Sequence, residues 1–314
     1  MKDKIIVIVG PTAVGKTAYS IELAKQFNGE VISGDSMQIY KTLDVGTAKV
    51  TPEEMDGIPH HLIDIKETDE SYSVSDFQKD ASEEIEKMIE KGKVPIVVGG
   101  TGLYIESLLY SVSHSGEAEP NFELRDELEE YVKKNSNQEL WKKLDKIDPE
   151  AAEKIHPNNV RRVIRALEVY YETGQLFSSF QNERKKKEAR YEAYIICLNT
   201  DRSLLYERIN KRVDIMMEEG LVEEAQSLWK KLGPQANAQS TKGIGYQELF
   251  LYFNHQITLD EAVEKIKQNS RRYAKRQLTW FRNRLEKVHW YDFILEPEGK
   301  EKSFIEIKEF LKDE

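Results

Sequence analysis

The chain has 314 residues, a formal net charge of −10 and one cysteine, Cys197. This length suffices for a full α/β core plus a second module, while a single cysteine excludes an intrachain disulfide and is typical of a reducing compartment. The N-terminal apolar run is too short for a signal peptide and no stretch approaches a membrane span, so we expect a soluble, cytoplasmic protein without a membrane partner.

The first part of the chain alternates strands and helices in the manner of a parallel sheet. Apolar runs predict strands at 4–9, 30–33, 61–65 and 94–98, with helices after Lys16, at about 75–91 and after Gly102. From about 120 to 190 helical spacing replaces the β-branched runs, and a strand at 193–199 then returns the chain to the sheet. Later segments predict helices at 201–219, 221–232, 245–254, 259–286 and 301–312, with a last strand at 288–291.

A phosphate-binding loop directly follows the first predicted strand. Its sequence, Gly-Pro-Thr-Ala-Val-Gly-Lys-Thr, matches G-x-x-x-x-G-K-[ST] between an apolar strand and a helical pattern. Backbone N–H groups, the helix N-terminus and the Lys16 ammonium can surround a diphosphate, while the Thr17 hydroxyl can bind the expected cofactor, Mg²⁺. The candidate diphosphate-binding residues are Gly10, Pro11, Thr12, Ala13, Val14, Gly15, Lys16 and Thr17, and the candidate metal ligand is Thr17.

These patterns predict an α/β fold in which a parallel sheet of the P-loop NTPase type is flanked by helices and interrupted by an all-helical domain. We expect residues 1–118 and 191–314 to form the core with its late helices, and 119–190 to form the insertion. Inside the core, Cys197 and Trp280 are expected to be packing residues, since they sit in a buried-strand pattern and at helical spacing.

Two further segments carry chemistry at predicted strand ends. Asp35 to Tyr40 put a carboxylate, a hydroxyl, an amide and a ring beside the phosphate loop; the carboxylate can accept a proton, and the amide and ring can read and stack a base. A capping Asp is the alternative. The strand at 94–98 ends in a glycine-rich turn, Gly99 to Gly102, which lets another molecule approach and exposes Thr101. Asp35 and Asp64 both remain candidates for the acid of a kinase site.

Charge is distributed unevenly along this acidic chain. From Lys265 to Lys287 there are nine Lys and Arg against one acid, and a second basic stretch runs from Arg161 to Arg190. Local basic faces of this kind can bind RNA, although solvated helix faces are the alternative. The adjacent His60 and His61 diverge on a strand and have no third ligand nearby, so a turn or substrate-loop role is preferred to a zinc site.

The order of these motifs resembles the bacterial tRNA dimethylallyltransferase family. Lys242 departs from the small residue that is commoner in the family before Gly-Ile-Gly-Tyr. We expect a bacterial form, since these residues contain no zinc-finger pattern like that in the tail of eukaryotic members. The resemblance spans residues 10 to 282 and rests on blocks at 10–17, 35–40, 46–49, 59–61, 99–104, 156–168, Arg208 with Arg212, 220–221, 243–246 and 274–282.

The resemblance implies transfer of the dimethylallyl group of dimethylallyl diphosphate to N6 of adenosine 37 in the tRNA anticodon stem-loop, with release of diphosphate. Lys16 and an arginine clamp, for which Arg208 and Arg212 are the candidates, would stabilise the leaving group. Asp35 is placed to accept the N6 proton and Thr101 to hydrogen-bond or orient the amine, although either of the two could be the proton acceptor. The base would be flipped into a pocket. The implied tRNA contacts are Asp35, Ser36, Met37, Gln38, Thr101, Arg125, Asn159, Val160, Arg161, Arg162, Val163, Lys275 and Arg276.

Two other classes of function are compatible with the phosphate loop. A P-loop kinase of a nucleoside or metabolite would consume ATP but would have no use for the basic insertion. A non-catalytic RNA-binding protein with a structural nucleotide would leave Asp35 and Thr101 without a task. Prenyl transfer accounts for all of these features, and for such an enzyme we expect a monomer.

Overall fold

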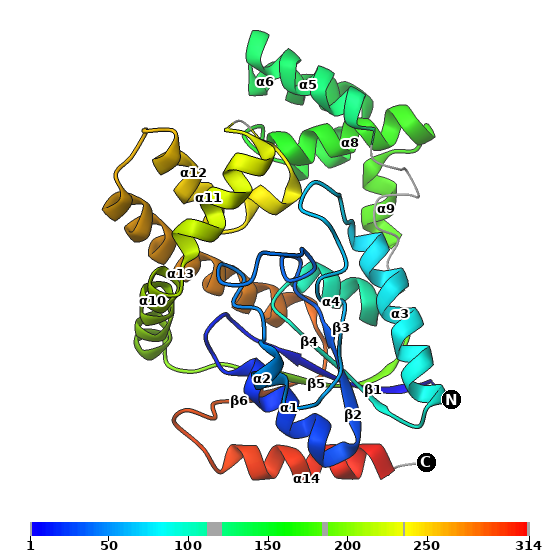
Figure 1. Ribbon diagram of the computed structural model, residues 1–314. Coiled ribbons are helices and arrows are strands. Elements are labelled where there is room, and N and C mark those ends of the chain that lie inside the picture. Colours follow the sequence, from blue (N-terminus) through cyan, green and yellow to red (C-terminus); the bar gives the residue numbers. More distant parts are fainter. Residues whose placement is uncertain (1, 112–120, 184–187, 235, 313–314) are drawn as a thin grey trace. The chain divides into compact units, whose positions relative to one another are not determined.

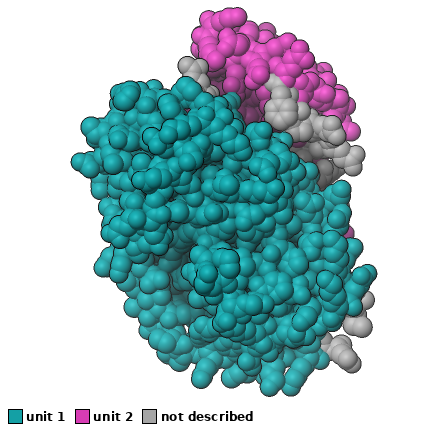
Figure 2. Space-filling model, viewed as in Figure 1, with its two compact units in different colours: residues 1–109, 190–314 teal, residues 110–189 magenta. Residues whose placement is uncertain are grey.

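The computed structural model describes residues 2–111, 121–183, 188–234 and 236–312. The chain divides into two compact units (Figures 1 and 2), one formed by Met1–Leu109 and Arg190–Glu314 and the other by Tyr110–Ala189. The second unit therefore begins earlier in the chain than the expected 119. Among the described residues, no helix is both long enough and apolar enough to cross a membrane.

A six-stranded parallel sheet with the order β3-β2-β4-β1-β5-β6 is the centre of the first unit. Continuous apolar runs form its middle strands because helices cover both faces of such a sheet. In the register, Val9 is the partner of both Gly99 and Cys197, so the loops after three strands emerge at one edge. The strands are β1 (Lys4–Val9), β2 (Gly29–Ser33), β3 (His60–His61), β4 (Val94–Gly99), β5 (Glu192–Leu198) and β6 (Val288–Tyr291).

Helices flank the sheet, and α14 lies alongside α1 on one of its faces (Figure 1). Helix starts follow from local chemistry: Ser73 and Thr258 each form a capping box, with Asp76 and Glu261 as partners. The helices of this unit are α1 (Lys16–Phe27), α2 (Pro52–Met55), α3 (Val74–Glu90), α4 (Gly102–Leu109), α10 (Arg202–Glu218), α11 (Leu221–Leu232), the 3-10 helix Gln239–Lys242, α12 (Tyr246–Phe253), α13 (Leu259–Arg284) and α14 (Gly299–Lys312).

The second unit is helical in its described residues, as predicted, and has its own core. Its buried Glu168 accepts hydrogen bonds from Arg125 Nε at 2.8 Å, from Arg165 Nη1 at 2.6 Å and from the Asn121 backbone N–H at 2.9 Å. The chain enters and leaves this unit at one point, where Tyr110 and Ala189 form an antiparallel bridge. Its helices are α5 (Phe122–Lys134), α6 (Asn137–Ile147), α7 (Pro149–Lys154), α8 (Val160–Thr173) and α9 (Phe177–Glu183).

One predicted strand is wrong, and two packing predictions have different outcomes. The strand expected at 61–65 is limited to β3, because Leu62 and Asp64 adopt left-handed backbone conformations with φ of 61° and 55°, which no strand accommodates. Cys197 is fully buried in β5, as predicted, and burial raises the pKa of its thiol to about 12. Trp280 is only half-buried, with its indole against Gly102.

Candidate functional site

The phosphate loop leaves β1 at the edge where β4 and β5 also end. Gly10 has φ of 150°, and a Cβ there would overlap the carbonyl oxygen of Leu198, so the strand ends can approach only with glycine at this position. Gly15 precedes α1 with φ of 102°. The Lys16 ammonium turns back over the loop and donates a hydrogen bond to the Pro11 carbonyl at 2.8 Å. The predicted loop therefore has the curled form that phosphate binding requires.

Two cations and one carboxylate set the electrostatics beside this loop. Burial, together with the neighbouring positive charge of Arg212, lowers the pKa of Lys16 to about 8, while Asp35 opposes this shift. Burial also lowers the pKa of Arg212. Arg208, one turn earlier on α10, is exposed and donates from Nε to the Ala13 carbonyl at 3.0 Å. Because two cations face one acid, the site favours an anionic ligand.

Asp35 and Thr101 belong to two loops that are hydrogen-bonded to each other. Thr101 Oγ1 accepts a hydrogen bond from the Ser36 backbone N–H at 3.1 Å and donates one to Ser36 Oγ at 3.2 Å. Asp35 Oδ1 accepts from the Met37 backbone N–H at 2.8 Å. The Asx turn fixes the Asp35 carboxylate, and the Thr101 contacts hold the two loops together. The structure thus brings the predicted proton acceptor and its predicted helper into one network.

The glycine-rich turn lets other parts of the same chain come close. Side chains at Gly99 and Gly100 would overlap the Gly34 backbone and the Gln277 amide, and one at Gly102 would overlap the Trp280 indole. The groups that approach this turn closely therefore come from the chain itself. Glycine is needed so that β4, the loop after β2 and α13 can meet at Thr101.

Two residues expected to read and stack a base are already engaged. Gln38 Oε1 accepts from Ser33 Oγ at 3.0 Å, and its Nε2 donates to the carbonyls of Thr47 and Ala48 at 3.3 Å each. The amide therefore holds the 44–48 loop. The Tyr40 ring is fully buried and cannot stack on a base, so that part of the prediction is wrong.

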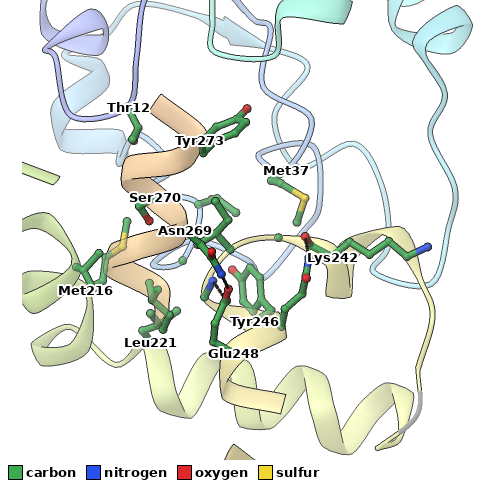
Figure 3. Close-up of a pocket in the computed structure, with 18 of the residues that line it drawn as sticks. Thr12, Met37, Met216, Leu221, Lys242, Tyr246, Glu248, Asn269, Ser270 and Tyr273 are labelled. Carbon is green, nitrogen blue, oxygen red and sulfur yellow. Dashed lines mark hydrogen bonds between the residues drawn. The ribbon is translucent and has the colours of Figure 1, made fainter. Parts of the chain in front are cut away.

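A cavity of about 530 Å³ opens beside Asp35, a size suited to a small organic ligand. Figure 3 shows Tyr273, Met37 and Tyr246 among the residues around it, and Asn269 donates to Glu248 at 2.7 Å in its wall. Burial raises the pKa of Tyr273 to about 12. Polar lining residues include Thr12, Asp35, Ser36 and Arg212, and apolar ones include Ile209, Val213, Met216, Leu221 and Ile266.

A carboxylate that sequence reasoning missed holds one wall of this cavity. Glu224, on α11, accepts hydrogen bonds from the backbone N–H groups of Asp44, Val45 and Gly46 at 2.6, 2.8 and 2.9 Å. The Tyr246 hydroxyl donates to the same carboxylate at 2.7 Å. The sequence motifs at 46–49 and 243–246 include two partners of this carboxylate, Gly46 and Tyr246. No sequence pattern indicates that Glu224 contacts them.

The other acidic and histidine candidates already have partners in the sheet-containing unit. Asp64 accepts from the buried Lys49 ammonium at 2.5 Å, which makes it part of a loop anchor. His61 lies between two carboxylates, 2.8 Å from Glu30 and 3.0 Å from Glu84. Within the described ranges, no group of three or more His, Cys, Asp or Glu side chains is arranged to hold a metal ion.

The predicted tRNA contacts of the helical unit differ in their accessibility. Asn159, Arg161 and Arg162 are exposed around the N-terminus of α8, where cationic side chains and the positive end of the helix dipole suit an anion. Val160 is half-buried. Val163 is fully buried in the core of its unit, so its side chain cannot contact RNA and only its backbone could do so. Arg125 forms the ion pair with Glu168 described above.

In the sheet-containing unit, the predicted contacts Lys275 and Arg276 are both exposed on α13, and Arg276 also lines the cavity. The Arg276 guanidinium lies 5.6 Å from the centre of the Tyr273 ring. A cation at the rim can therefore reach a ligand that extends out of the cavity.

The fold and the site define a P-loop-type α/β protein with an anion-binding loop and a ligand cavity at the carboxyl edge of its parallel sheet. Residues 38–284 match the IPP transferase family. The chain belongs to this family of prenyl-transferring enzymes, which confirms the resemblance drawn from its motifs.

Similar proteins cover almost the whole chain. A tRNA dimethylallyltransferase of Enterococcus faecalis is 53% identical over 310 residues, which is 98% of each chain. The solved tRNA isopentenylpyrophosphate transferase of Bacillus halodurans is 48% identical with a TM-score of 0.71, over 99% of this chain and 96% of that one. A eukaryotic dimethylallyltransferase acting on tRNA is 34% identical with a TM-score of 0.78, over 92% of this chain and 74% of that one.

Proposed function

We propose that the chain transfers the dimethylallyl group of dimethylallyl diphosphate to N6 of adenosine 37 in tRNA, giving N6-isopentenyladenosine and diphosphate. The observation that carries this proposal is the grouping of Thr12 of the phosphate loop, Arg212 and Asp35 around one cavity, with Lys16 close enough to both charged groups for each to shift its pKa. The shared name of the relatives, tRNA dimethylallyltransferase, supports the donor group and the acceptor. In the reaction, the C1–O bond to diphosphate breaks as the N6–C1 bond forms.

The leaving diphosphate gains negative charge as the C1–O bond breaks. Loop N–H groups, the Lys16 ammonium and Arg212 would stabilise this charge, while Arg208 would steady the loop through Ala13. The residues also fit Mg²⁺, because Thr17 is exposed on the first turn of α1 and this ion takes few protein oxygens beside those of phosphates and water. When bound, the metal supplies further charge neutralisation on diphosphate.

The proton released from N6 needs an acceptor beside the attacking amine, away from the leaving diphosphate. A carboxylate accepts protons readily, whereas a threonine hydroxyl is a poor base, so we assign this role to Asp35. One Asp35 oxygen already accepts from Met37, which leaves the other for the amine. Thr101 would orient the amine, and the apolar wall would hold the dimethylallyl chain away from water.

The test is to incubate the purified protein with Mg²⁺, dimethylallyl diphosphate and an unmodified tRNA carrying adenosine 37. We expect the tRNA mass to rise by one dimethylallyl group with release of one diphosphate, and no gain on a tRNA with another base at that position. A parallel reaction with ATP and candidate nucleosides tests the kinase alternative. Consumption of ATP with unchanged tRNA mass would contradict the proposal.

A further inference from the structure

One stripe of α13 holds the turn that carries Thr101. Tyr273, Gln277 and Trp280 are spaced four and three residues apart, so they share one face of the helix. The Tyr273 hydroxyl is 3.5 Å from the Gly100 carbonyl, and Gln277 Nε2 donates to the same oxygen at 3.0 Å. Trp280 packs against Gly102 at the far side of the turn. Helix α13 therefore sets where Thr101 lies.

Gln277 also reaches the phosphate loop. Its Oε1 accepts a hydrogen bond from the Thr12 backbone N–H at 3.1 Å, so the two ends of one amide contact two different loops. The side chain is buried, with 5% of its surface exposed. On the same helix Ala274 and Phe281 are fully buried and supply apolar packing. An amide between them is explained by the two hydrogen bonds that it makes, because a buried polar group is costly without partners.

We propose that Gln277 is a positioning residue for group transfer, whose amide fixes the separation between the phosphate loop and Thr101. The inference rests on the proposed function, in which the first loop holds the leaving group and the second orients the amine. Reaction requires the attacking nitrogen and C1 to lie about 3–3.5 Å apart and aligned. Gln277 acts through Thr12 and Gly100, and it need not touch either substrate.

The arrangement of the turn supports this role. A side chain at Gly100 would overlap Gln277 Nε2, so glycine at that position permits the hydrogen bond. The same turn is bound on its other side to the loop after β2, through Thr101 and Gly34. Loss of the Gln277 amide would leave the turn attached to Asp35's loop, to Tyr273 and to Trp280, but it would remove the side chain that joins the turn to Thr12 of the phosphate loop.

Two variants separate the contacts of Gln277. Gln277→Met keeps the volume and removes both hydrogen bonds, while Gln277→Glu keeps the acceptor for Thr12 and loses the donor to Gly100. Gln268→Met and Gln268→Glu are matched controls, since Gln268 is exposed on the same helix. Each purified protein is measured for melting temperature, for kcat and for KM of both substrates, and for hydrolysis of dimethylallyl diphosphate that yields no modified tRNA.

We expect kcat of Gln277→Met to fall by about 10²-fold while both KM values stay close to those of the controls, since misalignment lowers the rate of the bound complex. Gln277→Glu should also lose kcat, and a larger share of donor should be hydrolysed in both variants. The positioning role would be overturned if kcat of the Gln277 variants equalled that of the Gln268 controls. It would also be overturned if kcat and KM changed only in proportion to the loss of melting temperature. If the methionine variant does not fold, the glutamate variant decides. A wild type that leaves tRNA unmodified would contradict the proposed function itself.

Discussion

Lys16 is a phosphate-loop residue whose charge changes at mildly alkaline pH. Its pKa, lowered to about 8 by burial and by Arg212, means that the ammonium is present at pH 7 and is lost as the pH rises through 8. Because the proposed ligand is an anion that binds the ammonium form, the affinity for dimethylallyl diphosphate should fall above pH 8, by up to about tenfold per pH unit. Calorimetric titration at pH 7 and at pH 9.5 measures this change.

Lys16→Arg is the control for that titration, because arginine stays charged over this range. Its affinity should be weaker than that of the wild type at pH 7 but nearly independent of pH. Equal wild-type affinities at the two pH values would show that the Lys16 charge does not contribute to binding.

Asp35 and Thr101 make different contributions in the proposed reaction, so their variants should differ in degree. Asp35→Asn removes the proton acceptor but keeps the shape, and we expect kcat to fall by about 10²–10⁴-fold with little change in tRNA affinity. Thr101→Val should have a smaller effect because it removes an orienting hydroxyl. Single-turnover rates and tRNA binding curves give the two quantities. A parallel loss of binding and turnover would instead indicate a binding role.

The sequence predicts which residues lie beside a site more readily than it predicts which partners their side chains contact. Asp35 was placed correctly because carboxyl ends of parallel strands border the ligand site. Gln38 and Tyr40 follow in the same segment, yet one holds a loop and the other is buried. Their partners at Ala48 and in the core depend on packing that the local sequence does not specify.

Helix α11 holds the 44–46 loop in place through the hydrogen bonds of Glu224. Glu224→Ala leaves three backbone N–H groups and the Tyr246 hydroxyl without their acceptor. We expect the free energy of unfolding to fall by about 1–3 kcal/mol, together with a loss of donor affinity as the cavity wall loosens. Chemical denaturation and donor titration measure the two effects.

The neighbouring Glu223 provides the control for that experiment, because it is exposed on the same turn of α11. Glu223→Ala should leave both stability and donor affinity almost unchanged. If the two variants behave alike, the Glu224 hydrogen bonds do not stabilise the cavity wall.

Helices and strands with a clear hydrophobic pattern in the local sequence were predictable. The middle strands β1, β4 and β5 are continuous apolar runs, and α13 has a long amphipathic pattern, so the predicted bounds of both kinds of element lie close to the actual ones. The strand at 61–65 was overpredicted because left-handed conformations at Leu62 and Asp64 leave no mark in an apolar pattern. Contacts such as that of Glu224 with Gly46 join residues 178 apart in the chain, beyond the reach of periodicity.

The whole molecule is acidic, so RNA binding must rely on local basic surfaces. Charge reversal of the exposed Arg161 and Arg162 to Glu should raise the tRNA KM and flatten its dependence on salt, because fewer phosphate contacts release fewer counterions. The KM for dimethylallyl diphosphate serves as an internal control and should not change. Steady-state kinetics over a salt series provides the measurement, and an unaltered salt slope would remove both arginines from the RNA interface.

The junction between the two units has a consequence for how such a chain can change over evolution. The core leaves off at Leu109 and resumes at Arg190, whose backbone N–H donates to the Leu109 carbonyl at 2.8 Å. Because these ends already meet, the sheet does not need the intervening segment to bring them together, and lengthening that segment adds only slowly to the entropy of loop closure. We therefore expect that the helical unit can gain, lose or exchange sequence while the sheet-containing unit keeps its geometry.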